Sequence, residues 1–212
     1  MSTGNPHDLK VATQIGEKLI EYLEPACHRI TLAGSIRRQT RRVNDVELLL
    51  CPKRETVANG LFGTKEVSAI DAILADLEKR DVLERVKGGE KYKQYIYKLA
   101  FPHIKIDLWT AFLHSWGFQL AIRTGPWQLS KRMVTQRCKN GLLHDDYKCE
   151  GGSVWTCRGN DPADSVAFDI WQEHEDAPPA QGIWNMYPTP DEQDFFKLID
   201  GGYIPPERRR YA

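Results

Sequence analysis

The alternation of apolar and polar positions divides the first half of the chain into helices and strands. Apolar residues recur at helical spacing from Asp8 to Leu23 and from Ser68 to Lys79, and Asp8 and Ser68 are typical helix N-cap residues. Short apolar or alternating runs, which are typical of strands, cover 30–33, 43–51, 92–99 and 104–109. We therefore expect this half to be an α/β or α+β domain, a sheet with helices packed on it.

The second half begins with helical patterns and then becomes irregular. Helices are expected over 112–123 and 126–139, and a segment rich in glycine, proline and tryptophan follows over 146–188. Thr189-Pro190-Asp191-Glu192 has the pattern of a capping box, which predicts a last helix. The change of pattern near Ala111 predicts a domain boundary there. The expected domains are 1–111 and 112–212, the second with an inserted segment at about 149–188.

The composition is that of an ordinary globular protein, in which 29 basic residues balance 29 acidic ones over 212 residues. No apolar run approaches the length of a membrane span, and the opening residues MSTGNPHDLK lack the apolar core of a signal peptide. We therefore expect a cytoplasmic protein without membrane contact, in an ordinary or an infected cell.

The five cysteines form no C-x-x-C pair, which favours reduced thiols over a disulfide framework. A zinc site is the sharper alternative, but the spacing of its candidate ligands is irregular and typical of no common zinc module. Those candidate ligands are Cys138, His144, Cys149 and Cys157.

The charges are unevenly distributed along the chain. Five basic residues and no acidic one occur over 113–141, whereas 161–200 holds ten acidic residues and one basic residue. Such asymmetry indicates either a positive groove for a nucleic acid or two differently solvated faces.

Three carboxylates stand inside apolar strand patterns. Asp45 and Glu47 are two residues apart and therefore share one face of their strand, and Asp107 lies alone in the apolar run IKIDLW. If the two strands pair, the three carboxylates converge and cannot all ionise without a compensating cation. Hard divalent ions such as Mg²⁺ prefer oxygen ligands, and two ions about 3.5–4 Å apart support an in-line displacement.

A strand that runs into Gly34-Ser35 adds the pattern of an anion site. A glycine lets backbone N–H groups approach a phosphate closely, and the Ser35 hydroxyl can donate to it. Four arginines that follow supply fork-shaped donors matched to phosphate oxygens. They are Arg37, Arg38, Arg41 and Arg42.

With these residues in view, the sequence resembles the family X DNA polymerases, the group of DNA polymerase beta. AGSIRRQTRRVNDVELLL together with IKIDLW is similar to the nucleotidyltransferase palm of that family. RTGPWQLSKRMVTQRCKNGLLHDDY resembles its thumb segment, and DEQDFFKLIDGGYIPPERR resembles its closing segment. The resemblance covers the chain from about residue 8 to its end, except the stretch from Cys149 to Pro188.

The resemblance implies an α+β fold, in which a nucleotidyltransferase palm, a mixed sheet with helices, is followed by a small α/β thumb. It implies that Asp45, Glu47 and Asp107 are catalytic ligands of two Mg²⁺ ions, with Mn²⁺ as a substitute. It also implies a nucleoside triphosphate held by Gly34, Ser35, Arg38, Thr124 and Gly125. Since about thirty residues precede Gly34, the amino-terminal lyase activity of larger members is not expected. The residues expected to contact DNA are Lys105, Lys131, Arg132, Arg137 and Lys139.

The sequence departs from the family pattern at several positions, among them Ser130 and Val134 in the helix after the Thr-Gly turn. Glu47 stands where DNA polymerases usually have aspartate, and Lys105 stands where arginine is common beside the third acid. Ile122-Arg123 replaces the two aromatic residues that screen the sugar 2′ position, which leaves the choice between deoxyribose and ribose open.

The expected function is template-dependent DNA polymerisation, a two-metal nucleotidyl transfer to a primer 3′-hydroxyl in gap filling or repair. Gapped or primed DNA and a nucleoside triphosphate are the expected partners. One alternative is a template-independent or RNA nucleotidyltransferase that uses NTPs. The other is a catalytically silent nucleic-acid-binding subunit, against which the presence of all three acids counts.

Overall fold

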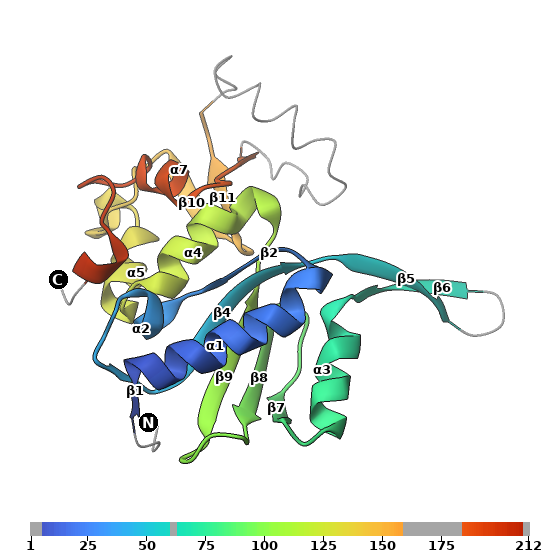
Figure 1. Ribbon diagram of the computed structural model, residues 1–212. Helices are drawn as coiled ribbons and strands as arrows, with labels where there is room; N and C mark the ends of the chain where they lie inside the picture. The colour runs from blue at the N-terminus through green and yellow to red at the C-terminus, as the bar shows by residue number, and fades with distance from the viewer. Residues whose placement is uncertain (1–5, 60–62, 159–183, 210–212) are drawn as a thin grey trace. The chain divides into compact units, whose positions relative to one another are not determined.

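The computed structural model describes residues 6–59, 63–158 and 184–209, in which the chain forms a mixed α+β structure (Figure 1). Its contacts divide it into two compact units, 1–110 and 111–212. Residues 159–183 of the expected insertion lie outside the described residues. Within the described ranges, no helix combines the length and the apolar character needed to cross a membrane.

The first unit contains a five-stranded mixed sheet. Its sheet strands are β2 (Cys27–Leu32), β4 (Asp45–Pro52), β7 (Leu83–Lys87), β8 (Tyr92–Tyr97) and β9 (Ile104–Thr110). Its helices are α1 (Leu9–Leu23), η1 (Glu24–Ala26), α2 (Gly34–Arg37) and α3 (Ile70–Lys79). The strand order is β2-β4-β9-β8-β7, with β4 and β9 parallel and the other neighbours antiparallel. The expected pairing of the two acid-bearing strands is therefore confirmed.

The apolar core of this unit lies between the sheet and α1 and α3, which cover one of its faces (Figure 1). The sequence alternation decides which strand residues enter the core. Val46 and Leu48 of β4 and Ile106 and Leu108 of β9 are buried members of it. Successive strand residues point to opposite faces. The intervening acids of β4 and β9 consequently lie on the face opposite the two helices.

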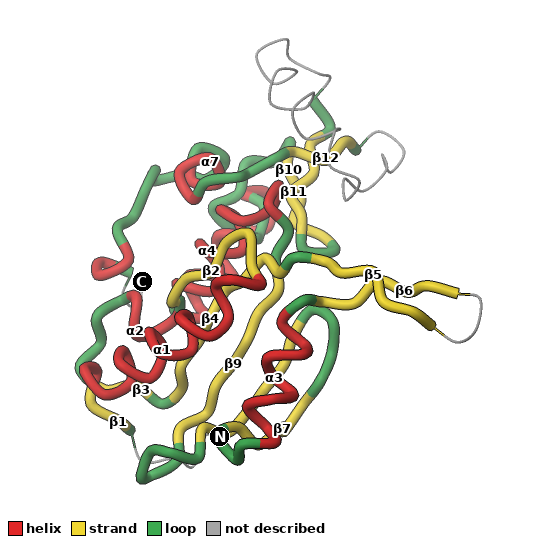
Figure 2. Tube along the Cα trace, turned by 45° about the vertical axis from the view of Figure 1, so that its right-hand side comes forward, coloured by secondary structure: helices red, strands yellow, loops and turns green. Residues whose placement is uncertain are grey.

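Two short ribbons complete the unit. β1 (His7–Asp8) pairs with β3 (Arg42–Val43), and β5 (Arg54–Asn59) pairs with β6 (Gly63–Ser68). The β5–β6 hairpin extends beyond the five-stranded sheet (Figure 2). The hydrophobic pattern did not predict it, because the hairpin is mostly polar and exposed and buries no apolar face.

The second unit packs helices against a three-stranded antiparallel sheet. Its elements are η2 (Leu113–Ser115), α4 (Trp116–Thr124), α5 (Trp127–Met133), η3 (Arg137–Lys139), β10 (Tyr147–Glu150), β11 (Ser153–Thr156), β12 (Asn185–Tyr187), α7 (Glu192–Phe196) and η4 (Pro206–Arg208). Its core joins Phe118 of α4, Leu129 and Met133 of α5, and Phe195 and Phe196 of α7.

The helix expected over 126–139 is shorter in the structure, where α5 ends at Met133. The β-branched Thr135 donates its hydroxyl to the Lys131 carbonyl at 2.7 Å, and such a side-chain bond competes with the helix. Gln136 then forms a β-bridge with Leu143. The prediction of one continuous basic helix is therefore wrong.

The capping box of α7 is shifted along the chain from its expected position. Asp191 and Asp194 form it, whereas it was expected from Thr189 to Glu192. Glu192 is instead buried, and its carboxylate accepts a hydrogen bond from the Arg209 guanidinium at 2.7 Å. This buried ion pair links α7 to the segment after Gly202. Removing either partner would leave an uncompensated buried charge.

The two expected N-caps of the first unit differ in outcome. Asp8 caps α1 by accepting the Lys10 N–H at 2.9 Å, which confirms that prediction. Ser68 belongs to β6 instead, α3 begins after Ala69, and the Ser68 hydroxyl is buried without a hydrogen-bond partner.

We predict opposite effects of alanine at these two positions. Asp8→Ala should lower the free energy of unfolding by about 1 kcal/mol, because a helix N–H loses its acceptor. Ser68→Ala should leave it within about 0.5 kcal/mol or raise it, because an unsatisfied buried hydroxyl is removed. Urea unfolding followed by circular dichroism measures both. A loss from Ser68→Ala as large as that from Asp8→Ala would contradict the assignment.

Candidate active site

The carboxylate of Asp107 is the most buried of the three predicted acids and is held by neighbours on the sheet. β9 places it opposite Gln94 of β8 and opposite Glu47 of β4. Its Oδ1 atom accepts hydrogen bonds from the Tyr92 hydroxyl and from Gln94 Nε2, both at 2.8 Å. Gln94 Nε2 also donates to the Tyr92 oxygen at 2.7 Å, so the three side chains form a closed triangle.

Tyr92 is a donor in this triangle because its phenol stays protonated. The pKa of Tyr92 lies above its ordinary value, because the phenol is buried and, to a smaller extent, because it donates to the neighbouring Asp107 carboxylate. Its ring stacks on Trp109, with centroids 4.1 Å apart. The stack fixes the ring, and the hydroxyl therefore keeps its direction toward Asp107.

Lys105 lies between two of the acids. Its ammonium is 2.9 Å from Asp45 Oδ2 and 3.1 Å from Asp107 Oδ2. Burial alone lowers the pKa of Lys105, but the ion pairs with Asp45 and then Asp107 more than offset it, so the pKa lies above its ordinary value. The side chain therefore remains a cation that pairs with both carboxylates.

Glu47 directs its carboxylate toward the turn between β2 and α2. A side chain on Gly34 would collide with Glu47 Oε2, and Gly34 has a φ of +57°, a conformation that favours glycine. The Ala33 N–H donates to the Glu47 carbonyl at 2.8 Å and extends the pairing of β2 and β4 to this point. The turn and the acid are thus in direct contact.

The strand–glycine–serine–helix turn predicted from the sequence is present, with β2 leading through Ala33 into α2. Within this turn the Ser35 hydroxyl is buried and has no hydrogen-bond partner. Arg38 caps α2, and its backbone N–H donates to the Gly34 carbonyl at 3.2 Å. An unsatisfied hydroxyl beside a glycine turn matches the donor that a phosphate oxygen would need.

The oxygen donors fit hard divalent ions in their chemistry. Among the described residues, however, no three metal-ligating side chains converge as a ready-made group. Asp45 and Asp107 converge on the Lys105 ammonium, whereas Glu47 contacts Gly34. The cation position between two carboxylates is formed, and the two magnesium ions stay a prediction.

The other predicted nucleotide-binding residues belong to the second unit. Thr124 is fully buried at the end of α4, and Gly125 caps that helix through an N–H bond to the Ala121 carbonyl at 3.1 Å. Ser130 donates its hydroxyl to the Ile122 carbonyl at 2.6 Å and secures the same turn. The predicted Thr-Gly turn is therefore a defined structural feature of this unit.

The basic residues expected to contact DNA divide into two groups. Lys131, Arg132, Arg137 and Lys139 are exposed, the first two on α5 and the others on η3. Arg137 also pairs with Asp200 at 3.6 Å. Lys105 differs from all four, because its ammonium contacts the acids of β4 and β9. DNA contact by any of the five stays a prediction.

All five cysteines are free thiols. Burial raises the pKa of the Cys149 thiol to about 12. Among the residues that the structure describes, no three His, Cys, Asp or Glu side chains are grouped as a metal site, so the alternative zinc set is not assembled.

Sequence reasoning missed Tyr92 and Gln94 as site residues. The signal was present, because the alternation over 92–99 places both side chains on one strand face. What was missing was the register, which sets Gln94 opposite Asp107. The register follows from the antiparallel pairing of β8 and β9, which hydrophobic periodicity alone does not specify.

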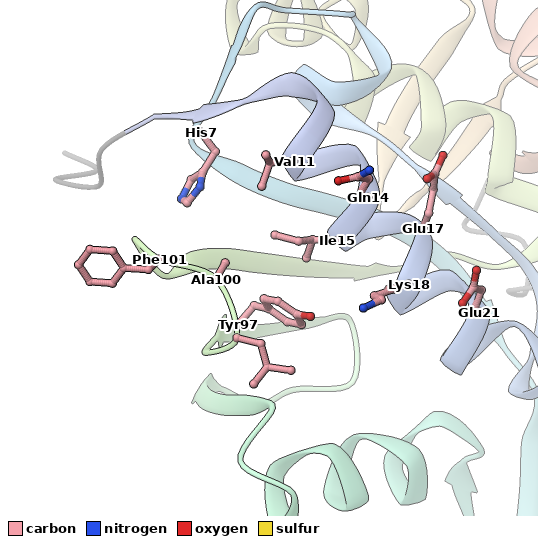
Figure 3. Close-up of a pocket in the computed structure, with 11 residues that line it drawn as sticks. His7, Val11, Gln14, Ile15, Glu17, Lys18, Glu21, Tyr97, Ala100 and Phe101 are labelled. Atoms are coloured by element: carbon pink, nitrogen blue, oxygen red, sulfur yellow. The ribbon is translucent and has the colours of Figure 1, made fainter.

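A separate pocket of about 570 Å³ lies in the first unit (Figure 3). It is lined by His7, by residues of α1 between Val11 and Glu21, by Tyr97 at the end of β8, and by Leu99, Ala100 and Phe101 after that strand. None of the acids or turn residues above lines it. The candidate site is therefore the acid-bearing face of the sheet and not this pocket.

Compared with known proteins, the chain matches no family model and no curated protein sequence.

Gly34→Ala should destabilise the protein by about 1–3 kcal/mol, because it combines a left-handed backbone with a collision against Glu47. Gly151→Ala is the matched control, since Gly151 has a similar φ of +65° and open space around it. Urea unfolding measures both variants. Equal losses at the two positions would show that contact with Glu47 contributes nothing.

Proposed function

We propose that the chain is a nucleotidyltransferase of the family X DNA polymerase type, with a palm over 1–111 and a thumb over 112–212, which extends a DNA primer on a template. The observation that carries the proposal is that Asp45 and Asp107, on parallel neighbouring strands, together hold one cation, the Lys105 ammonium. A glycine–serine turn in contact with Glu47 supports it from the adjacent strand. Together they support the active site that the sequence resemblance implies.

The reaction forms one bond and breaks another at phosphorus. The primer 3′-hydroxyl attacks the α-phosphate of a nucleoside triphosphate, and pyrophosphate leaves. Asp45, Glu47 and Asp107 would hold Mg²⁺, which when bound neutralises the phosphates and lowers the pKa of the attacking hydroxyl. Asp107 is the proposed acceptor of the proton of that hydroxyl, and Tyr92 and Gln94 hold its carboxylate in one orientation.

The turn residues would bind the triphosphate. The Ser35 hydroxyl lacks a partner and can donate to a phosphate oxygen, while Gly34 keeps the turn free of a side chain. Arg38, the C-cap residue of α2, adds a guanidinium cation suited to phosphate oxygens. The resemblance assigns two further roles to residues of the second unit, contact with the nucleotide sugar to Thr124-Gly125 and contact with DNA phosphates to the exposed basic residues of α5 and η3.

A template-independent or NTP-using transferase is the second candidate. Ile122 and Arg123, half-buried on the last turn of α4, carry it, because neither is an aromatic screen for a ribose 2′-hydroxyl. The same three acids would serve either enzyme, so the choice rests on substrate and not on the chemistry of transfer.

Primer extension tests the proposal. Full-length protein with Mg²⁺ or Mn²⁺ should add dNTPs on gapped or recessed DNA as the template directs. Asp107→Asn should lower the rate by at least about 10²-fold, because the proton acceptor and a carboxylate charge are lost together. Asp71→Asn is the matched control, since Asp71 pairs with Lys93 at 3.1 Å elsewhere in the unit and should keep full activity.

Each outcome of that assay has a distinct meaning. Addition to single strands, or of NTPs in preference to dNTPs, would replace the first candidate with the second. DNA binding without any addition would overturn both and leave a binding subunit. Activity that survives Asp107→Asn would show that the three carboxylates are misassigned.

A further inference from the structure

The ammonium of Lys105 occupies a position that a divalent ion would also seek. It lies within 3.1 Å of one oxygen of Asp45 and one oxygen of Asp107, and both are Oδ2 atoms. The strand register places Lys105 opposite Asp45, and Asp107 is two residues further along the same strand, so the Lys105 side chain reaches both carboxylates. A cation held by two carboxylates and a metal ion bound to the same oxygens exclude each other.

We propose that Lys105 is an internal competitor for the divalent ion, so that metal binding must displace its ammonium from Asp45 and Asp107. This inference rests on the proposed function and adds a form of regulation to it. Without metal, the ammonium keeps Asp45 and Asp107 paired, and the site takes up metal only where the ion outcompetes the lysine.

The hydrogen bonds of Asp107 make such an exchange feasible without loss of order. Its Oδ1 atom is held by Tyr92 and Gln94, whereas its Oδ2 atom contacts Lys105 alone among the described partners. Displacement of the ammonium therefore frees Oδ2 while Oδ1 keeps the carboxylate in place. Lys105 is about 30% exposed, so the released ammonium has solvent within reach.

Binding of Mn²⁺ to the full chain, measured by calorimetry without nucleotide or DNA, tests the proposal. Lys105→Met should bind Mn²⁺ about tenfold more tightly than wild type or better, because a unit positive charge leaves the ion's position. Lys93→Met is the matched control, because Lys93 is also a sheet lysine paired with an aspartate, and it should stay within about twofold of wild type. Adding Asp107→Asn to Lys105→Met should abolish the gain.

A second measurement uses the unaltered protein and does not depend on the folding of a variant. An amine-reactive ester should label Lys105 several times faster in saturating Mg²⁺ than without it, as read by mass spectrometry, because the ammonium is released. Labelling of Lys93 should not change.

Unchanged or tighter protection of Lys105 in Mg²⁺ overturns the proposal, as does Mn²⁺ affinity in Lys105→Met no higher than in Lys93→Met. If the wild-type chain transfers nucleotides under either result, only this inference fails. If the chain neither binds Mn²⁺ nor transfers nucleotides, the proposed function fails with it.

Discussion

The placement of acids on the inner strands of a sheet depends on one interaction, the shared contact of Lys105 with Asp45 and Asp107. Burying a carboxylate without a partner costs several kcal/mol, and two carboxylates side by side repel each other as well. The ammonium offsets both costs at once. β4 and β9 can therefore lie parallel and in register although each carries acids among buried apolar residues.

The two faces of the sheet have different roles, because one face packs in the core and the other carries the acids. Alternate residues of β4 and β9 bury apolar side chains against α1 and α3, and the residues between them carry the candidate site. The core fixes the backbone that carries Asp45, Glu47 and Asp107. Hydrogen bonds from Tyr92 and Gln94 of β8 fix the direction of the Asp107 carboxylate. A site on central strands gains rigidity that loops do not provide.

Much of this arrangement could be predicted from the sequence, because it follows from local pattern. The helix after Asp8, the strands around Asp45 and Asp107, and the Gly34-Ser35 turn all have short-range signals. The unpredicted features depend on long-range pairing. Lys105 bridges two strands only in the parallel register, and Ser68 lost its expected cap role because the segment pairs in a hairpin. A polar hairpin carries a weak periodic signal, so the pattern does not predict β5–β6. A helix end with β-branched residues is equally hard to locate, and the helix predicted after Pro126 is too long.

Anomalous X-ray diffraction from crystals soaked in Mn²⁺ tests most directly the claim that this face is a cation site. We expect a manganese peak between the Oδ2 atoms of Asp45 and Asp107, with the Lys105 ammonium withdrawn from both. Absence of a peak there at saturating Mn²⁺, with Lys105 still bridging the two carboxylates, would contradict it.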